Sequence, residues 1–311
     1  MRKAKFLLIT FVVALLSACG TTRTVPITGR KQNLLVSDAQ ILNLSNQEYT
    51  KYMSSAKKST NSTNTAMVKR VGTRLANAVE NYLRSHNMAN EVKNFSWEFN
   101  LVKDNNVNAF CMPGGKIVVY EGLLPVTQDE SSLAIVLGHE IAHAVAKHSA
   151  EQMSKQIRQQ YGMQIGAGIL GAAGVGSDMT SIAATIAQYG FSFRNLKYSR
   201  DNESEADHMG LIFAAMAGYD PRVAVTFWQR MAAKSGGNQN DMFSDHPSDA
   251  KRIAAIKTEL PEALKYYNAA KGISNNSTPT KRSTKKTSSQ KNTRKQVKSV
   301  SAESLYKNMK K

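Results

Sequence analysis

The sequence has 311 residues, of which 41% are hydrophobic and 21% are charged. This composition is typical of a globular protein, and it excludes a fully disordered chain and a protein with many membrane spans. The formal net charge of +18 is unevenly distributed, because residues 272–311 hold eleven Lys or Arg residues and one acidic residue. The middle of the chain is therefore only mildly basic.

The N-terminus has the pattern of an export signal. Basic residues lead into an apolar run over residues 6–16, which is too short to cross a bilayer comfortably and is typical of a cleaved signal peptide. The following Leu16-Ser17-Ala18-Cys19 resembles a bacterial lipobox, which implies removal of residues 1–18 and lipidation of Cys19. A signal peptide without lipidation and a short membrane anchor are the alternatives.

The sequence has one further cysteine, Cys111, so no disulfide within the chain is expected and a buried, unreactive thiol is predicted. The polar residues 19–33, which include Pro and Gly, predict an irregular lipidated tether. A folded domain is expected over residues 34–270. Residues 271–311 have too few apolar side chains to pack and are predicted to form a disordered basic tail.

Apolar spacing predicts two helices at the start of this domain and a small sheet after them. Helical periodicity covers residues 37–57 and 66–85. Alternating Phe, Trp, Phe and Leu side chains predict a strand over residues 95–101. Two further strands are expected at 107–111 and 117–120, separated by the turn sequence Met-Pro-Gly-Gly.

The sequence Thr-Gln-Asp-Glu at residues 127–130 has the pattern of a capping box, and it predicts the start of a helix that carries His-Glu-Ile-Ala-His at residues 139–143. Histidines four residues apart lie on one face of a helix, so both rings can bind one ion, whereas Glu140 is rotated to its side. Alternatively, both histidines only satisfy hydrogen bonds on an amphipathic helix. A zinc site requires a third ligand from elsewhere in the chain.

The Gly- and Ala-rich residues 162–190 predict two close-packed helices or a mobile hairpin, in preference to an element that dips into a membrane. Beyond them, Glu203 and Asp207 lie four residues apart on a predicted helix, and one carboxylate can bind the metal while the other supports a ligand. Glu205 is an alternative ligand on the residues alone. The last helices are expected at 203–217, 221–233 and 248–260.

Together these motifs resemble the HtpX and CaaX-prenyl-protease family of zinc metallopeptidases, and in particular its exported lipoprotein branch. The resemblance rests on His-Glu-Ile-Ala-His, on Ser-Arg-x-x-Glu-x-x-Ala-Asp at residues 199–207, and on the flanking segments VPITGRKQNLLVS, VNAFCMPGGKIVVYEGLL and DHPSDAKRI. It covers about residues 19–260 and does not include the basic tail. It implies an α+β, mostly helical, zincin-like metallopeptidase domain with a small β-sheet and the HExxH sequence on an active-site helix.

The resemblance also implies a metal centre. One Zn²⁺ would be bound by His139, His143 and Glu203, and Glu140 would be the general base. Glu203 is preferred to Glu205 because the family places the ligand four residues before the aspartate that matches Asp207. Asp207 itself is expected beside the ligands as a supporting residue.

Further roles follow from the same resemblance. His246, within Asp-His-Pro, is expected near the active site, either as a donor to the oxyanion or as a fourth zinc ligand that holds the enzyme latent. A capping histidine in a loop is the alternative. Arg252 is a second candidate for the donor, and is otherwise expected beside the ligands. An edge strand with Asn108, Ala109 and Phe110 is expected to bind an extended substrate through main-chain hydrogen bonds.

The expected function is therefore that of a membrane-anchored zinc metalloendopeptidase that cleaves unfolded or misassembled cell-envelope proteins. The chain is expected in the bacterial cell envelope, lipid-anchored at the outer membrane and facing the periplasm. An envelope chaperone or assembly factor with little protease activity is the alternative. Nucleic acid is not an expected partner, because the chain is exported and Tyr306 is the single aromatic residue of its basic tail.

Overall fold

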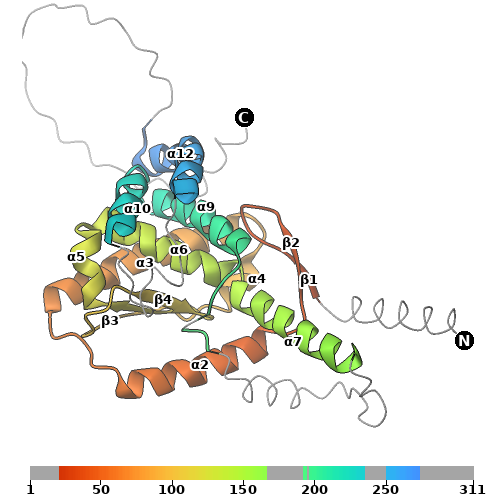
Figure 1. Cartoon of the computed structure of the whole chain (residues 1–311). Helices are drawn as coiled ribbons and strands as arrows, with labels where there is room; N and C mark the ends of the chain where they lie inside the picture. Colours follow the sequence, from red (N-terminus) through yellow and green to blue (C-terminus); the bar gives the residue numbers. More distant parts are fainter. Residues whose placement is uncertain (1–20, 167–191, 195, 235–249, 274–311) are drawn as a thin grey trace, which may run out of the picture.

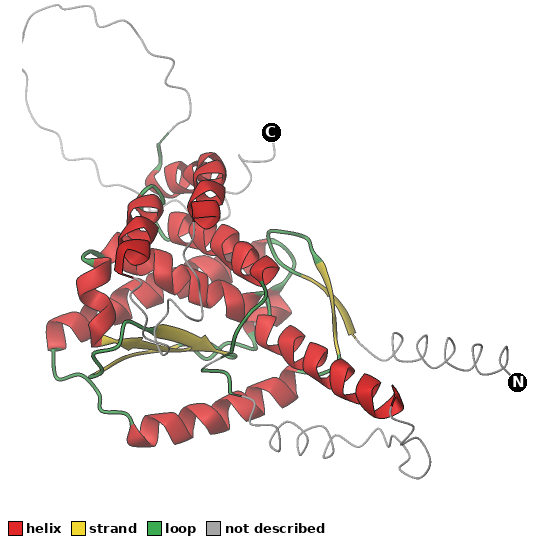
Figure 2. Ribbon diagram, viewed as in Figure 1, coloured by secondary structure: helices red, strands yellow, loops and turns green. Residues whose placement is uncertain are grey.

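The structure is a computed structural model, and it describes residues 21–166, 192–194, 196–234 and 250–273. A small sheet lies between α2 (Asp38–Ser55) on one face and α3 (Ser62–Ser85) and α6 (Glu130–Val145) on the other (Figure 1). On the far side of α6 pack α9 (Arg200–Met216) and α10 (Val223–Lys234), and α12 (Ala250–Lys271) packs on α9. Helices dominate the described residues (Figure 2), so the expected mostly helical α+β class is confirmed.

The sheet has the strand order β3-β5-β4. β3 (Glu98–Val102) runs parallel to β5 (Lys116–Tyr120), and β4 (Ala109–Met112) runs antiparallel to it. The expected Met-Pro-Gly-Gly turn joins β4 to β5, with Gly114 at φ 88° and Gly115 at φ 82°, a backbone region that favours glycine. A Cβ atom on Gly115 would also lie 2.4 Å from the ring of Trp97. All three predicted strands are therefore present, although β3 begins only at Glu98.

Both faces of the sheet are buried, because alternate strand residues enter two different cores. Ala109, Ile117 and Val119 face the larger core, which α3, α6 and α9 complete. Phe110 and Val118 face a second core, which contains residues of α2 and α7 (His148–Gly166). Packing on both faces of the sheet thus fixes the position of α6 relative to α2.

The helices α6 and α9 cross with their backbones in close contact. A Cβ atom added to Gly138 would lie 2.6 Å from the carbonyl oxygen of Gly210, and one added to Gly210 would lie 2.6 Å from the backbone nitrogen of His139. Only glycine leaves room for backbones this close. The crossing therefore brings His139 next to the helix that carries Glu203 and Asp207.

Residues 21–34 correct the prediction of an irregular tether. They form an antiparallel hairpin of β1 (Thr21–Thr24) and β2 (Lys31–Leu34), joined by a turn with Gly29 at φ 69°. Val25 is buried at 1% exposure, and the amide of Gln32 donates to the carbonyl of Ala146 at the end of α6. The polar composition of residues 21–34 predicted a segment without contacts to the domain, but polar side chains such as that of Gln32 form hydrogen bonds with it.

The start of α6 also differs from the predicted capping box. Asp129 is the N-cap, and its carboxylate accepts a hydrogen bond from the backbone N–H of Ser132 (2.7 Å). Thr127 instead ends α5 (Leu124–Thr127), which follows the short 3-10 helix η1 (Glu121–Leu123). Gln128 has φ 68°, a left-handed conformation that ends α5. The next helix therefore starts after Gln128, and its cap is Asp129 in place of Thr127. The helix carries residues 139–143 as predicted.

Helices α2, α3, α9 and α10 begin and end within four residues of their predicted bounds, whereas α4 (Ala89–Val92), α5 and α7 were not predicted. Ser37 caps α2, α4 is a single short turn after α3, and α12 continues beyond its predicted end at Leu260. α12 passes through Pro261 because the residues beyond it, including the buried Ala263, pack against the core. Cys111 is a free, buried thiol, as predicted.

Several predicted features lie outside the described residues. These are the signal peptide with Cys19, most of the Gly- and Ala-rich segment, His246, and nearly all of the basic tail. Among the helices that are described, none combines the length and apolarity needed to cross a membrane.

Gly210→Ala is expected to lower the free energy of unfolding by about 1–3 kcal/mol, because its methyl group overpacks a contact between two backbones. Urea denaturation measures the change. Ser204→Ala, at an exposed position of the same helix, is the matched control and should stay within about 0.5 kcal/mol of the original chain. An unchanged stability in the Gly210 variant would contradict the close crossing.

Candidate metal centre

Three potential metal ligands converge where α6 meets α9. His139 and His143 on α6 are each 1% exposed, and Glu203 in the first turn of α9 is 9% exposed. The two Nε2 atoms are 3.1 Å apart, and each lies 3.4 Å from a carboxylate oxygen of Glu203. The structure therefore brings together the three ligands expected from the sequence.

This arrangement fits one zinc ion. Imidazole nitrogen and carboxylate oxygen are ordinary zinc ligands, and atoms bound about 2.0–2.1 Å from a tetrahedral ion lie roughly 3.3 Å from one another. The spacings of 3.1–3.4 Å between the ligand atoms of His139, His143 and Glu203 match that value. Three protein ligands also leave a fourth position open, as in catalytic zinc sites.

His139 is oriented by a buried ion pair. Its Nδ1 lies 2.9 Å from Oδ1 of Asp207, and the same oxygen accepts a hydrogen bond from Nη2 of Arg252 (2.6 Å). Burial alone would raise the pKa of Asp207, but the charge of Arg252 and the hydrogen bond with His139 outweigh burial and lower it. The guanidinium of Arg252 also stacks 3.5 Å above the ring of Trp228. Asp207 and Arg252 thus lie beside the ligands, as expected.

His143 is held by residues that the sequence reasoning left without a role. Its Nδ1 lies 2.8 Å from Nδ1 of His148, which is fully buried at the start of α7. Tyr198 stacks on the ring of His143 with a centroid separation of 4.0 Å, and its hydroxyl hydrogen-bonds with that of Ser149 (2.9 Å). The available signal was a further histidine, His148, five residues after His143. Its partner became visible only when the fold was known.

Glu205, the alternative ligand that the sequence left open, is not part of the ligand cluster. Its Oε2 accepts from Nε2 of His148 (2.9 Å) and from Nε of Arg30 (2.8 Å), and its Oε1 accepts from the hydroxyl of Thr28 (2.6 Å). Burial opposes ionisation of Glu205, but these hydrogen bonds outweigh it and lower its pKa to about 2. The carboxylate is therefore a charged partner of His148.

Glu140 is 3% exposed and lies on the side of α6 that faces β4. Burial raises the pKa of the Cys111 thiol, and the negative charge of Glu140 adds to this effect. Burial also raises the pKa of Tyr198, and the negative charge of Glu140 adds to that rise. Glu140 is therefore within electrostatic range of both Cys111 and Tyr198, and it is not one of the three clustered ligands.

The predicted substrate-binding residues are not part of this cluster. Ala109 and Phe110 lie in β4 and Asn108 directly precedes it, but the ring of Phe110 packs against Tyr52 and Tyr120 in the second core. A contribution of this strand to the site would therefore come from its backbone. His246 and Cys19 lie outside the described residues.

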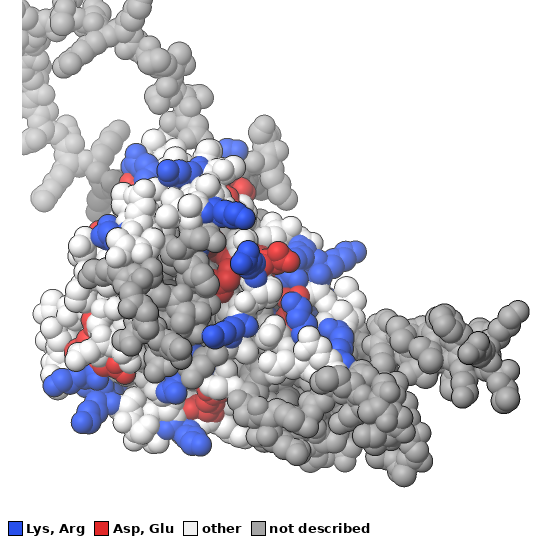
Figure 3. Space-filling view, viewed as in Figure 1, with Lys and Arg blue, Asp and Glu red and all other residues white. Residues whose placement is uncertain are grey.

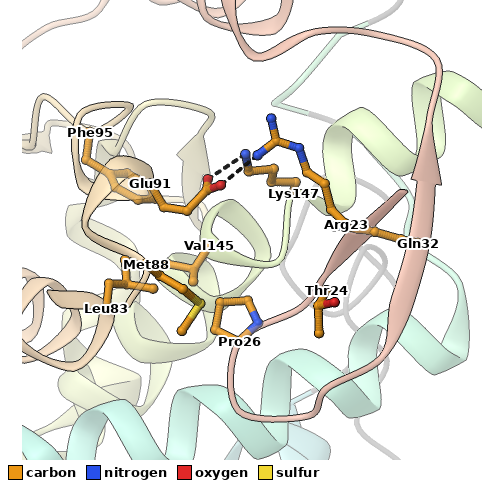
Figure 4. Close-up of a pocket in the computed structure, with 10 residues that line it drawn as sticks. All are labelled: Arg23, Thr24, Pro26, Gln32, Leu83, Met88, Glu91, Phe95, Val145 and Lys147. Carbon is orange, nitrogen blue, oxygen red and sulfur yellow. Dashed lines mark hydrogen bonds and ion pairs between the residues drawn. The ribbon is translucent and has the colours of Figure 1, made fainter. Parts of the chain in front are cut away.

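A cavity of about 200 Å³ lies away from the metal ligands, between the N-terminal hairpin and the junction of α6 with α7 (Figure 4). Its apolar lining includes Leu83 and Met88. At its rim, Glu91 forms ion pairs with both Arg23 (2.6 Å) and Lys147 (2.7 Å). Arg23 and Lys147 also form ion pairs with Asp38, so these two cations and two carboxylates balance one another. The cavity is therefore not assigned a reaction.

Comparison with known proteins gives an independent view of this site. The profile of peptidase family M48 matches residues 64–260, which is more than half of the chain and includes all three ligands. The chain is 38% identical over 174 residues to mitochondrial metalloendopeptidase OMA1 of Schizosaccharomyces pombe, a match that covers 55% of this chain and 49% of the relative.

Two bacterial proteases are also similar. Metalloprotease LoiP of Escherichia coli is 29% identical over 230 residues, covering 72% of this chain and 82% of LoiP. The beta-barrel assembly-enhancing protease of Yersinia pestis is 31% identical over 187 residues, covering 58% of this chain and 38% of that protein. The matches to the OMA1 proteins of Schizosaccharomyces pombe, Arabidopsis thaliana and Homo sapiens span half or less of each relative.

Glu203→Ala is expected to abolish stable metal binding, because it removes one of three protein ligands. The loss of affinity should exceed the roughly 10–100-fold that follows loss of a partner outside the ligand set. The original chain should retain one zinc ion per chain after gel filtration, measured by plasma mass spectrometry. Asp201→Ala, at an exposed position of the same helix turn, is the control and should retain it too. One zinc ion per chain in the Glu203 variant would contradict the assignment.

Proposed function

The chain belongs to peptidase family M48, and we propose on that basis that it is a zinc metalloendopeptidase of the bacterial cell envelope. The observation that carries the proposal is the buried convergence of His139, His143 and Glu203, with Glu140 beside them. Two histidines and a glutamate with an open fourth position are the ligand set of zinc peptidases.

The chemistry follows from the position of each side chain. When bound, zinc would supply Lewis-acid polarisation of a peptide carbonyl and would lower the pKa of water. Glu140 takes the proton from the attacking water and later delivers it to the leaving amine nitrogen. Glu140 is buried beside the clustered ligands, on the helix that packs against β4.

The developing oxyanion needs a further hydrogen-bond donor. Arg252 is already engaged, because it donates to Asp207 and stacks on Trp228 behind His139. The proposed donor is therefore His246, and occupation of the fourth zinc position by His246 in a latent enzyme remains the alternative role.

We propose that β4 binds the substrate as an added strand. Tyr120 donates its N–H to the carbonyl of Asn108, so the alternation of an antiparallel ladder turns the N–H and C=O groups of Ala109 and Cys111 away from β5. Within the described sheet, β4 is an edge strand, and α6 packs against it. An extended peptide on this edge would pair with main-chain groups close to Glu140.

Main-chain recognition tolerates many side chains and requires an unfolded segment, which favours unfolded or misassembled clients. On the face shown in Figure 3, basic and acidic side chains are interspersed among the described residues, which favours backbone pairing over selection by charge. The name of the Yersinia pestis relative refers to β-barrel assembly. We therefore propose envelope proteins as clients, with the chain anchored through Cys19 at the outer membrane and facing the periplasm.

An envelope chaperone or assembly factor is the second candidate, because an edge strand that captures unfolded segments can act without cleaving them. The two functions differ in whether Glu140 is required.

Glu140→Gln is expected to reduce cleavage of an unfolded protein, such as reduced casein, by at least about 1,000-fold, because the amide cannot accept the proton. Zinc content should stay at one ion per chain. Glu130→Gln, in the first turn of the same helix and paired with Arg70 on the surface, is the control and should cleave at the original rate. Cleavage by the Glu140 variant at the original rate would sink the enzyme proposal. Full complementation of a deletion by this variant would favour the chaperone.

Cys19→Ser is expected to stop incorporation of labelled fatty acid and to move the protein from the membrane fraction to the soluble fraction of cells, because the serine cannot form the thioether to the lipid. Cys111→Ala, at the other cysteine, is the control and should stay in the membrane fraction. Membrane retention and labelling of the Cys19 variant would refute the proposed anchor.

A further inference from the structure

We propose that His148 is a positioning residue that fixes the tautomer and ring orientation of His143, and that the N-terminal hairpin supports it through Arg30 and Glu205. This inference rests on the proposed zinc site and extends it to residues outside the ligand cluster. It assigns a role to a buried histidine and a buried glutamate that the mechanism above does not use.

The contacts form an unbroken chain from the hairpin to the metal ligand. Nδ1 of His143 lies 2.8 Å from Nδ1 of His148, and Nε2 of His148 lies 2.9 Å from Oε2 of Glu205. That oxygen also accepts a hydrogen bond from Nε of Arg30 at 2.8 Å. His143 and His148 are at most 1% exposed and Glu205 is 7% exposed, so water cannot readily replace these partners.

The position of hydrogen atoms follows from the carboxylate. Arg30 and Thr28 both donate to the carboxylate of Glu205, which is therefore placed as an acceptor for Nε2 of His148 as well. With its hydrogen on Nε2, His148 presents Nδ1 as an acceptor. Nδ1 of His143 must then be the donor in the 2.8 Å contact. The lone pair of His143 is thereby left on Nε2, which is the atom that faces His139 and Glu203. The chain of contacts thus selects the tautomer that can bind zinc.

The backbone is arranged to allow this contact. α6 ends at Val145, and Lys147 has φ 55°, a left-handed conformation that is uncommon for a residue other than glycine. α7 begins directly after Lys147, and this change of chain direction places the ring of His148 against that of His143 on α6. The side chain of Lys147 is meanwhile held by Asp38 at 2.7 Å.

The hairpin fixes the far end of the chain of contacts. Thr28 donates to Oε1 of Glu205, and both Nη atoms of Arg30 donate to the carboxylate of Glu151 on α7, at 2.8 and 2.9 Å. Arg30 therefore joins the hairpin to α7 and α9 at once. The two histidine ligands are thus supported by segments from opposite ends of the sequence. The N-terminal hairpin supports His143, and Arg252 on α12 performs the corresponding role behind His139.

Zinc affinity of the full chain tests this inference, measured by competition with a chromophoric chelator. Arg30→Gln is expected to weaken zinc binding by up to about 10-fold, the low end of the effect of losing a direct partner of a ligand, because Arg30 acts on His143 through Glu205 and His148. Arg23→Gln is the matched control, because Arg23 lies in the same hairpin and binds Asp38 and Glu91 without touching Glu205. An equal loss in both variants, or no loss in either, would overturn the inference.

Two substitutions at His148 separate its contacts. In His148→Gln the amide can reach Glu205 but leaves no acceptor for His143, whereas in His148→Asn the amide oxygen can accept from His143 without reaching Glu205. Zinc affinity should fall in the order original chain, Asn variant, Gln variant. Original affinity in the Gln variant would overturn the inference. If the Gln variant does not fold, the two arginine variants still decide the question.

A spectroscopic measurement separates positioning from a general effect on folding. In the zinc-loaded chain, Nδ1–H of His143 should give a slowly exchanging, downfield proton resonance that His148→Gln lacks. An unchanged resonance in that variant, or its absence in the original chain, would contradict the role. Failure of this inference leaves Glu203→Ala without zinc, whereas failure of the proposed zinc site itself would leave zinc content unchanged in that variant.

Discussion

The site depends on the backbone contact between Gly138 on α6 and Gly210 on α9. Ligands at positions 139, 143 and 203 come from helices that are far apart in the sequence, and an ion can bind them all only if those helices nearly touch. A methyl group on either glycine would meet backbone atoms at 2.6 Å. This contact brings the carboxylates of Glu203 and Asp207 to His139, while the sheet beneath α6 keeps that helix in place. The three ligands can form one cluster only because of that approach.

Charged side chains are buried around the ligands, and the fold offsets the unfavourable free energy of burying them by pairing each one. Asp207, Arg252 and Glu205 are each less than 10% exposed, and burying unpaired charges of this kind would be strongly destabilising. Each is paired with opposite charge and with a histidine. Such pairs add little net stability, but they fix the rings of His139 and His143 in the orientation that zinc binding needs. The buried ion pairs thus orient the histidine ligands, whereas the two apolar cores stabilise the fold.

The ligands could be predicted from sequence because their signal is local. His139 and His143 lie four apart on one helix, and Glu203 belongs to a short motif with Asp207, so helix geometry and family resemblance were sufficient. The hairpin was missed because its polar residues resemble those of a free tether. Their partners, such as Glu205 for Arg30, lie 175 residues away. His148 was missed for the same reason, since its role depends on Glu205. The start of α6 was misassigned because Thr127 and Asp129 are both good caps, and the backbone at Gln128 decides between them.

Anomalous diffraction at the zinc absorption edge, from crystals of the zinc-loaded protein, tests the proposed metal centre. One strong anomalous peak per chain is expected, within bonding distance of Nε2 of His139, Nε2 of His143 and a carboxylate oxygen of Glu203. A principal peak bound elsewhere, or one that contacts Glu205 in place of Glu203, would contradict the proposed metal centre.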